Sequence, residues 1–169
     1  AHEDEALIYF RGTADASYAD RADRCRRHVL FVKEQQYLVL VDEFVAKRGM
    51  ASALQWNIHS WGAFETDGER AFWTERGNST LYGHVMHNRA GFFSLAEGWD
   101  PPPMRGKDSA QWLQQYHLRF TPNGIEVPKR NLGVVLCWDH AGWSKPAVET
   151  HLHGDCLLYT SPSPRDSDQ

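Results

Sequence analysis

Cysteine is scarce in this chain of 169 residues, which has only Cys25, Cys137 and Cys156. No two of them have the Cys-x-x-Cys spacing that zinc sites use, so the cysteines provide no metal motif. Cys25 and Cys137 are the pair able to form a disulfide in a secreted protein. Whether they lie close enough to do so is not determined by the sequence alone.

An excess of basic charge is also missing, because the net charge is −4. Proteins that bind nucleic acid normally carry a basic patch. The one arginine cluster, between Arg21 and Arg27, has Asp20 beside it and Asp23 within it, which favours local ion pairs on a solvated face. The charge pattern therefore argues against a nucleic-acid partner.

Long apolar runs and amphipathic helices are absent too. No run approaches the roughly 20 apolar residues that a membrane-spanning helix needs, so no membrane span is predicted. The window Ser109–Gln115 is the one weak helical pattern in the chain. Helices are therefore expected to contribute little to the fold.

Two adjacent apolar runs are the strongest positive signal, His28–Lys33 (HVLFVK) and Gln36–Val45 (QYLVLVDEFV). Both are rich in β-branched and aromatic residues, and only a Glu-Gln pair separates them, which predicts a β-hairpin. Within them the apolar residues are continuous rather than alternating, which is typical of strands covered on both faces. Arg27 and Asp42 are expected to form an ion pair across this hairpin.

Further short strands with turn signals between them continue along the chain. The predicted strands are Ala6–Arg11, Leu54–Ser60, Ala71–Glu75, Thr80–Met86, Gly91–Leu95, Gln114–Phe120 and Asn131–Trp138. The turn signals include Asp67 with Gly68 and Gly77 with Asn78. Three consecutive prolines, Pro101–Pro103, exclude a central strand and predict a surface loop over Glu97–Asp108.

This spacing of short strands predicts an all-β fold, an antiparallel β-sandwich that is incomplete at one or both ends. The expected core consists of Leu30, Phe31, Val39, Val41, Trp56, Ile58, Val134 and Leu136.

The C-terminal stretch Cys156–Asp166 (CLLYTSPSPRD) resembles the translation of a transposase sequencing adapter. A segment of that origin is excluded from reasoning about the fold. We therefore expect residues 1–155 to be a β-sandwich fragment of a larger protein and residues 156–169 to be a non-native, disordered tail.

An ordered series of motifs resembles the later part of the heparinase II/III-like polysaccharide lyases. An arginine enters an apolar strand in Arg27–Lys33, a second strand closes on an aspartate in Tyr37–Asp42, and a third ends on histidine in Trp56–His59. Similar neighbouring segments are Gly12–Asp15 with Tyr18, Phe92–Pro103, Tyr116–Phe120 and Leu132–Trp138. The resemblance covers most of residues 6–139.

The resemblance implies a parent enzyme that joins an α-helical toroid to β-sandwich domains and cleaves acidic polysaccharides by β-elimination. In that family a Tyr and a His act as base and acid, and some members hold a structural divalent metal. No position here matches those residues, so no catalytic residue and no cofactor is assigned to this chain. The resemblance therefore implies that this chain is a non-catalytic or cleft-supporting part of a periplasmic or secreted lyase. The missing toroid would be its partner, and the whole enzyme would reach the acidic glycan.

Trp99 and His59 are the two candidates for contact with substrate. An exposed Trp can stack on a sugar ring, and a His at a strand end can line a sugar groove. The alternatives are that Trp99 pins its loop to the core and that His59 is only a hydrogen-bonded strand end. Tyr18 and Tyr116, the latter next to His117, are nominal candidates for an elimination base, and their spacing singles out neither.

No metal site is predicted from the histidines. His84 and His87 point to opposite faces of a strand, and His151 with His153 lacks a third ligand. A stand-alone carbohydrate-binding or structural sandwich module of a secreted protein remains the alternative function.

Overall fold

The computed structural model describes residues 1–50, 54–87, 89–99, 113–123, 129–139, 150–153 and 156–159. Within these ranges all regular structure is β-strand, and no helix is long and apolar enough to cross a membrane. The strands are β1 (His2–Glu3), β2 (Leu7–Thr13), β3 (Ala22–Val32), β4 (Tyr37–Ala46), β5 (Trp56–Ser60), β6 (Phe64–Asp67), β7 (Ala71–Arg76), β8 (Ser79–Met86), β9 (Gly91–Glu97), β10 (Tyr116–Pro122), β11 (Lys129–Asp139), β12 (Thr150–His153) and β13 (Cys156–Tyr159).

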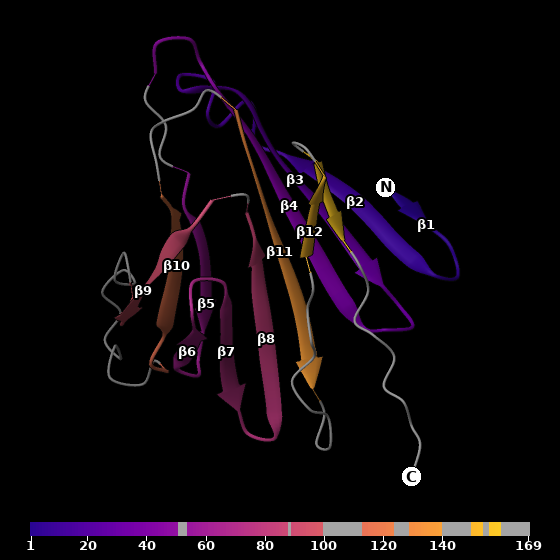
Figure 1. The fold of residues 1–169 in the computed structure, drawn as a ribbon, viewed down its shortest axis with the longest axis vertical. Coiled ribbons are helices and arrows are strands. Elements are labelled where there is room, and N and C mark those ends of the chain that lie inside the picture. Colours follow the sequence, from indigo (N-terminus) through magenta and orange to yellow (C-terminus); the bar gives the residue numbers. More distant parts are fainter. Residues whose placement is uncertain are drawn as a thin grey trace, which may run out of the picture.

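The strands form two main antiparallel sheets (Figure 1). The large sheet has eight strands in the order β1-β2-β3-β4-β11-β8-β7-β6, and the small sheet has three in the order β5-β10-β9. The predicted all-β, antiparallel, sandwich-like fold is therefore confirmed. The proline loop and the weak helical window fall mainly outside the described residues.

The predicted hairpin is β3 with β4, and Val29 pairs with Leu40 and Phe31 with Leu38. Its first strand begins earlier than expected, because the polar segment before His28 continues the ladder from Ala22. Cross-strand ion pairs explain this extension: Arg27 donates to both carboxylate oxygens of Asp42, at 2.6 and 2.7 Å. The predicted Arg27–Asp42 ion pair is thereby confirmed.

Buried side chains lie on both faces of the central strands, as the continuous apolar runs predicted. The main cluster fills the space between the sheets, where Phe72 of β7 contacts Trp56 of β5 and Phe93 of β9. A second cluster, around Val39 and Val135, lies on the opposite face of the large sheet. Of the expected core, Val39, Trp56, Val134 and Leu136 are buried, whereas Leu30, Phe31, Val41 and Ile58 are half-buried.

The backbone of Cys156–Tyr159, which belongs to the segment expected to be a disordered tail, forms β13 and pairs with β12. An apolar Cys-Leu-Leu-Tyr run is compatible with a strand irrespective of its origin. The adapter origin of this segment remains a prediction.

His87, directly after β8, is a buried histidine with cationic surroundings. Its Nδ1 accepts a hydrogen bond from the backbone N–H of Arg89 at 3.2 Å, and its ring lies against Phe120. Burial lowers the pKa of His87, and the charges of Arg130, Arg70 and Arg89 lower it further. A backbone hydrogen bond with Arg89 opposes this shift, but the net direction favours the neutral form of His87 in the folded protein over the unfolded chain.

This environment predicts a loss of stability in mild acid. The unfolded chain takes up the His87 proton near its ordinary pKa of 6.5, whereas the folded protein does so only at lower pH. The stabilisation is therefore complete above that pH and is lost as pH falls toward the folded pKa. In chemical unfolding between pH 8 and about pH 5, His87→Asn, whose Oδ1 lies where Nδ1 accepts from Arg89, should show a shallower decline than the unchanged chain. Equal slopes would contradict this account.

Candidate functional site

The outer face of the small sheet, on the side away from the large sheet, collects polar side chains from β5 and β10. The register pairs His59 with His117 and Asn57 with Arg119. The two imidazole centroids are 4.2 Å apart, and Arg119 Nε donates to Asn57 Oδ1 at 2.9 Å. Alternation explains the arrangement, because Trp56, Ile58 and Leu118 point inward to the core and leave the intervening residues facing water.

Trp99 lies at one end of this face, held by polar contacts. Gly98, with a φ of 98° that favours glycine, turns the chain after β9, and its N–H donates to Gln115 O at 2.8 Å. His117 Nε2 donates to the Gly98 carbonyl, and Trp99 Nε1 donates to Leu113 O at 3.2 Å. The ring nevertheless remains 39% exposed.

The structure therefore brings the two sequence-predicted contact residues to the same part of the small sheet. His59 touches His117, and His117 anchors the carbonyl directly before Trp99. Sequence reasoning missed the bridging role of His117, because strand pairing across 58 positions (117 minus 59) has no local signal. His117 therefore connects His59 on the neighbouring strand to the turn that precedes Trp99.

Another exposed indole, Trp61, directly follows β5 at this end of the small sheet. The guanidinium of Arg76 lies 4.3 Å from the centroid of the Trp61 ring, so a cation–π contact covers one face of the indole. The side chain is still 52% exposed.

The nominal catalytic tyrosines lie apart from each other and have different environments. Tyr18 is exposed in the turn between β2 and β3, whereas Tyr116 packs against the main core. His117 therefore points to the opposite face of β10 from its neighbour Tyr116. Among the described residues, no hydrogen bond joins either tyrosine to a histidine.

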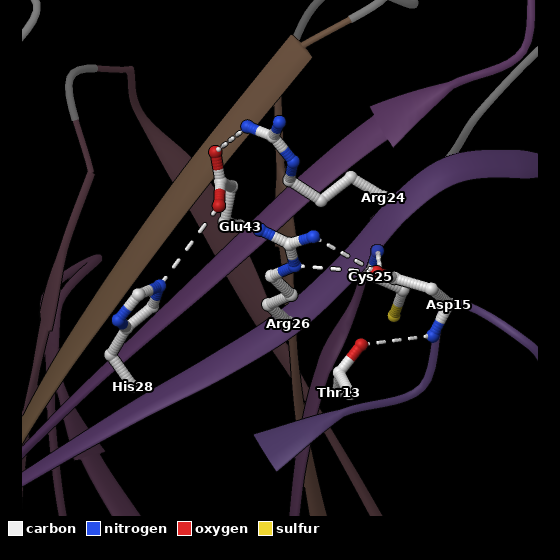
Figure 2. A network of polar contacts seen from close by, with 7 residues as sticks. All are labelled: Thr13, Asp15, Arg24, Cys25, Arg26, His28 and Glu43. Carbon is white, nitrogen blue, oxygen red and sulfur yellow. Dashed lines mark hydrogen bonds and ion pairs between the residues drawn. The ribbon is translucent and has the colours of Figure 1, made fainter. Parts of the chain in front are cut away.

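A different Tyr–His pair, missed from the sequence, lies on the far face of the large sheet. Tyr9 of β2 hydrogen-bonds His28 Nδ1 of β3 at 2.8 Å, and the rings are stacked. His28 Nε2 is 3.9 Å from Glu43, which accepts a 2.7 Å hydrogen bond from Arg24 (Figure 2). The residues are 19 positions apart along the chain, so only the strand register reveals the pair.

Asp15 completes this polar cluster from the loop before β3 (Figure 2). It accepts the backbone N–H of Cys25 at 2.7 Å and the guanidinium of Arg26 at 3.1 Å. The Cys25 N–H holds the pKa of Asp15 below its usual value, and Arg26 acts in the same direction. Arg24 likewise lowers the pKa of Glu43. The cluster thus pairs each acid with an arginine and fastens the loop and β4 to β3.

The two described cysteines, Cys25 and Cys137, are free thiols. Cys25 is opposite Phe44 on β4, and Cys137 is opposite Tyr37. Seven residues of strand, about 24 Å, separate those positions, far beyond the span of a disulfide. This register answers the question that the sequence left open.

Within the described ranges, no group of three or more His, Cys, Asp or Glu side chains is arranged to hold a metal ion. The side chains of His151 and His153 lie outside the described part of the structure, so this statement does not cover them.

The two stacked antiparallel sheets define the class of fold, a β-sandwich. No protein-family model matches the sequence, and no curated protein does. Solved structures do match the fold: heparan sulfate lyase HepC from Pedobacter heparinus, with a TM-score of 0.65 and 14% identity over 89% of this chain, and heparinase III, with a TM-score of 0.64 and 14% identity over 90%. A heparinase III described as the BT4657 gene product has a TM-score of 0.62 and 15% identity over 89% of this chain.

The chain spans 22–23% of the length of these structures. At such identity the likeness shows a shared fold.

Proposed function

We propose that this chain is the β-sandwich part of a polysaccharide lyase that cleaves acidic, uronate-containing glycans by β-elimination. The observation that carries the proposal is the match of about nine-tenths of the chain to heparan sulfate lyase and heparinase III structures. The order of the strand motifs from Arg27 to His59, which resembles that of the heparinase II/III-like lyases, is consistent with the proposal.

In this proposal the chain supports the substrate cleft and does not supply the acid and the base. β-Elimination needs a base, an acid and a group that neutralises the uronate carboxylate, all within reach of one sugar. The Tyr9–His28 pair brings together two suitable groups, but its neighbours Arg24 and Arg26 are engaged by Glu43 and Asp15. Because these arginines are already paired, the cluster is suited to holding the loop before β3, β3 and β4 together.

The proposal includes a parent protein with an α-helical toroid as the partner of this sandwich. The parent would be periplasmic or secreted, and any structural divalent metal would be held outside the described part of this chain.

The direct experiment is to extend the reading frame upstream in overlapping genomic sequence and to express the longer protein. We expect it to release unsaturated uronates, detected by ultraviolet absorbance, from heparan sulfate and not from a neutral glucan. A longer protein that folds and eliminates no uronate-containing glycan, or an upstream region unrelated to a helical toroid, would refute the proposal.

A stand-alone carbohydrate-binding module is the second candidate function. It is favoured by the partly exposed Trp99, which donates to Leu113 O and directly follows Gly98, whose carbonyl His117 binds. The same upstream sequence separates the two functions, because a module of this kind requires no toroid.

A further inference from the structure

We infer that the outer face of the small sheet binds an acidic oligosaccharide directly, through Arg119, His59, His117 and Asn57, with Phe92 and Trp99 at its two ends. The choice of an acidic glycan rests on the proposed function. The location of the site rests on the charge, exposure and geometry of this face.

Charge is the first argument. The register places His59 and Asn57 of β5, His117 and Arg119 of β10, and Ser94 and Ala96 of β9 on this face. Although the chain as a whole has a net charge of −4, these strands present no carboxylate on this face. A face with an arginine, two imidazoles and no acid is complementary to a carboxylated or sulfated sugar.

Arg119 supplies the specific anion-binding group. Its Nε is engaged by Asn57 Oδ1 at 2.9 Å, which fixes the plane of the guanidinium. In the described part of the structure its two terminal nitrogens make no hydrogen bond to protein, and the side chain is exposed. A fixed guanidinium with free N–H groups can bind a carboxylate or sulfate through two parallel hydrogen bonds.

Aromatic rings at both ends are the second argument. Phe92, opposite Thr121, is 54% exposed on the same face, and Trp99 follows the other end of β9. Exposed aromatic surface is unfavourable in water, and a ring held in place, as Trp99 is by its hydrogen bond to Leu113, loses little entropy when a ligand stacks on it. Phe92 thus lies on the same face as Arg119, and Trp99 follows the end of β9 that is near His117, so aromatic surface is available toward both ends of the strand.

The test is a titration of the full chain with a size-defined heparan sulfate oligosaccharide, followed by calorimetry and amide chemical shifts. Arg119→Ala should raise Kd about tenfold, as expected for one lost charge-assisted contact. Trp99→Ala and Phe92→Ala should each raise it severalfold. Binding should weaken with added salt and vanish for the same oligosaccharide after desulfation and carboxyl reduction.

Matched controls come from β2 of the large sheet. Phe10→Ala removes a ring that is 46% exposed, and Arg11→Ala removes an exposed guanidinium, so both should leave Kd unchanged. Thermal unfolding verifies that each variant is folded.

Three results would overturn the inference: no binding by the unchanged chain, equal loss in site and control variants, or equal affinity for the neutralised oligosaccharide. These failures are separate from failure of the proposed function, because the lyase activity of the upstream-extended protein is measured independently.

Discussion

Replacing Phe72 with alanine should lower the free energy of unfolding by about 3–5 kcal/mol, the usual cost of deleting an enclosed aromatic side chain. Phe72 is 1% exposed and lies at the centre of the aromatic cluster, with ring centroids 5.7 Å from Trp56 and 5.9 Å from Phe93. Both partners belong to the small sheet, so this residue joins the two sheets. Chemical unfolding measures the change, and Phe10→Ala should cost less than about 1 kcal/mol.

Gly83 provides the matching test of this packing. It pairs with Phe72 across β7 and β8, and a Cβ added there would lie 1.9 Å from Phe72 Cζ. Gly83→Ala should therefore destabilise the unchanged protein by about 1–3 kcal/mol. In the Phe72→Ala background the obstacle is absent, so the same substitution should cost much less. Additive costs in the double variant would show that the ring does not lie over Gly83.

Cys137 should react with an alkylating reagent at least about tenfold more slowly than a thiol of ordinary pKa. Burial raises the pKa of Cys137 from 9.0 to about 11, so two pH units separate its thiolate population from that of an ordinary cysteine. The thiolate is the nucleophile, and a thiolate of higher pKa is intrinsically more reactive, so the rate near neutral pH should fall by about tenfold, with burial slowing it further. Residue-resolved mass spectrometry of iodoacetamide labelling measures this rate.

The control for this prediction is the same labelling in denaturant, where Cys137 should react at the ordinary rate. Cys25, whose pKa is also raised by burial, provides a second thiol in the same sample. A disulfide between Cys25 and Cys137 under non-reducing conditions would contradict the register of β3, β4 and β11. Fast labelling of folded Cys137 would contradict its burial.

Local sequence patterns predicted most of the fold. Continuous apolar runs predicted the β3–β4 hairpin, and the turns at Gly68 and Gly77, which have φ values of 64° and 61°, occur where the sequence predicted them. Strand alternation correctly directed Trp56 inward and His59 outward. In these segments the local pattern and the tertiary packing agree.

What the sequence did not predict depends on contacts between distant positions. The sequence did not predict that β3 includes the polar residues before His28. Two arginines of that segment pair with Glu43 and Asp42 of β4, and these pairs become visible only when the strands are aligned. The central position of Phe72 in the core also depends on distant residues, because its neighbours Gly83 and Trp56 lie on other strands. The candidate site shows the same limit: His59 and Trp99 were identified from residue type, whereas His117 and Arg119 needed the β5–β10 register.

We propose that the two sheets have different roles, one as a scaffold and one as a glycan-binding surface. The large sheet carries a polar cluster whose acids and arginines neutralise each other, which suits a scaffold. The small sheet presents an exposed face without acids, bounded by aromatic rings, which suits binding of an anionic glycan. Under this proposal the chain contributes a wall of the cleft, and the chemistry resides elsewhere in the parent enzyme.

The most direct measurement is incubation of the purified chain alone with heparan sulfate, following the ultraviolet absorbance of unsaturated uronates. We predict no increase over a buffer blank, even at high protein concentration and long times, because under the proposed function the rest of the parent enzyme supplies the acid, the base and the carboxylate neutraliser. A steady increase that Tyr9→Phe or His28→Ala abolishes would contradict it, since the sandwich would then carry a complete catalytic site of its own.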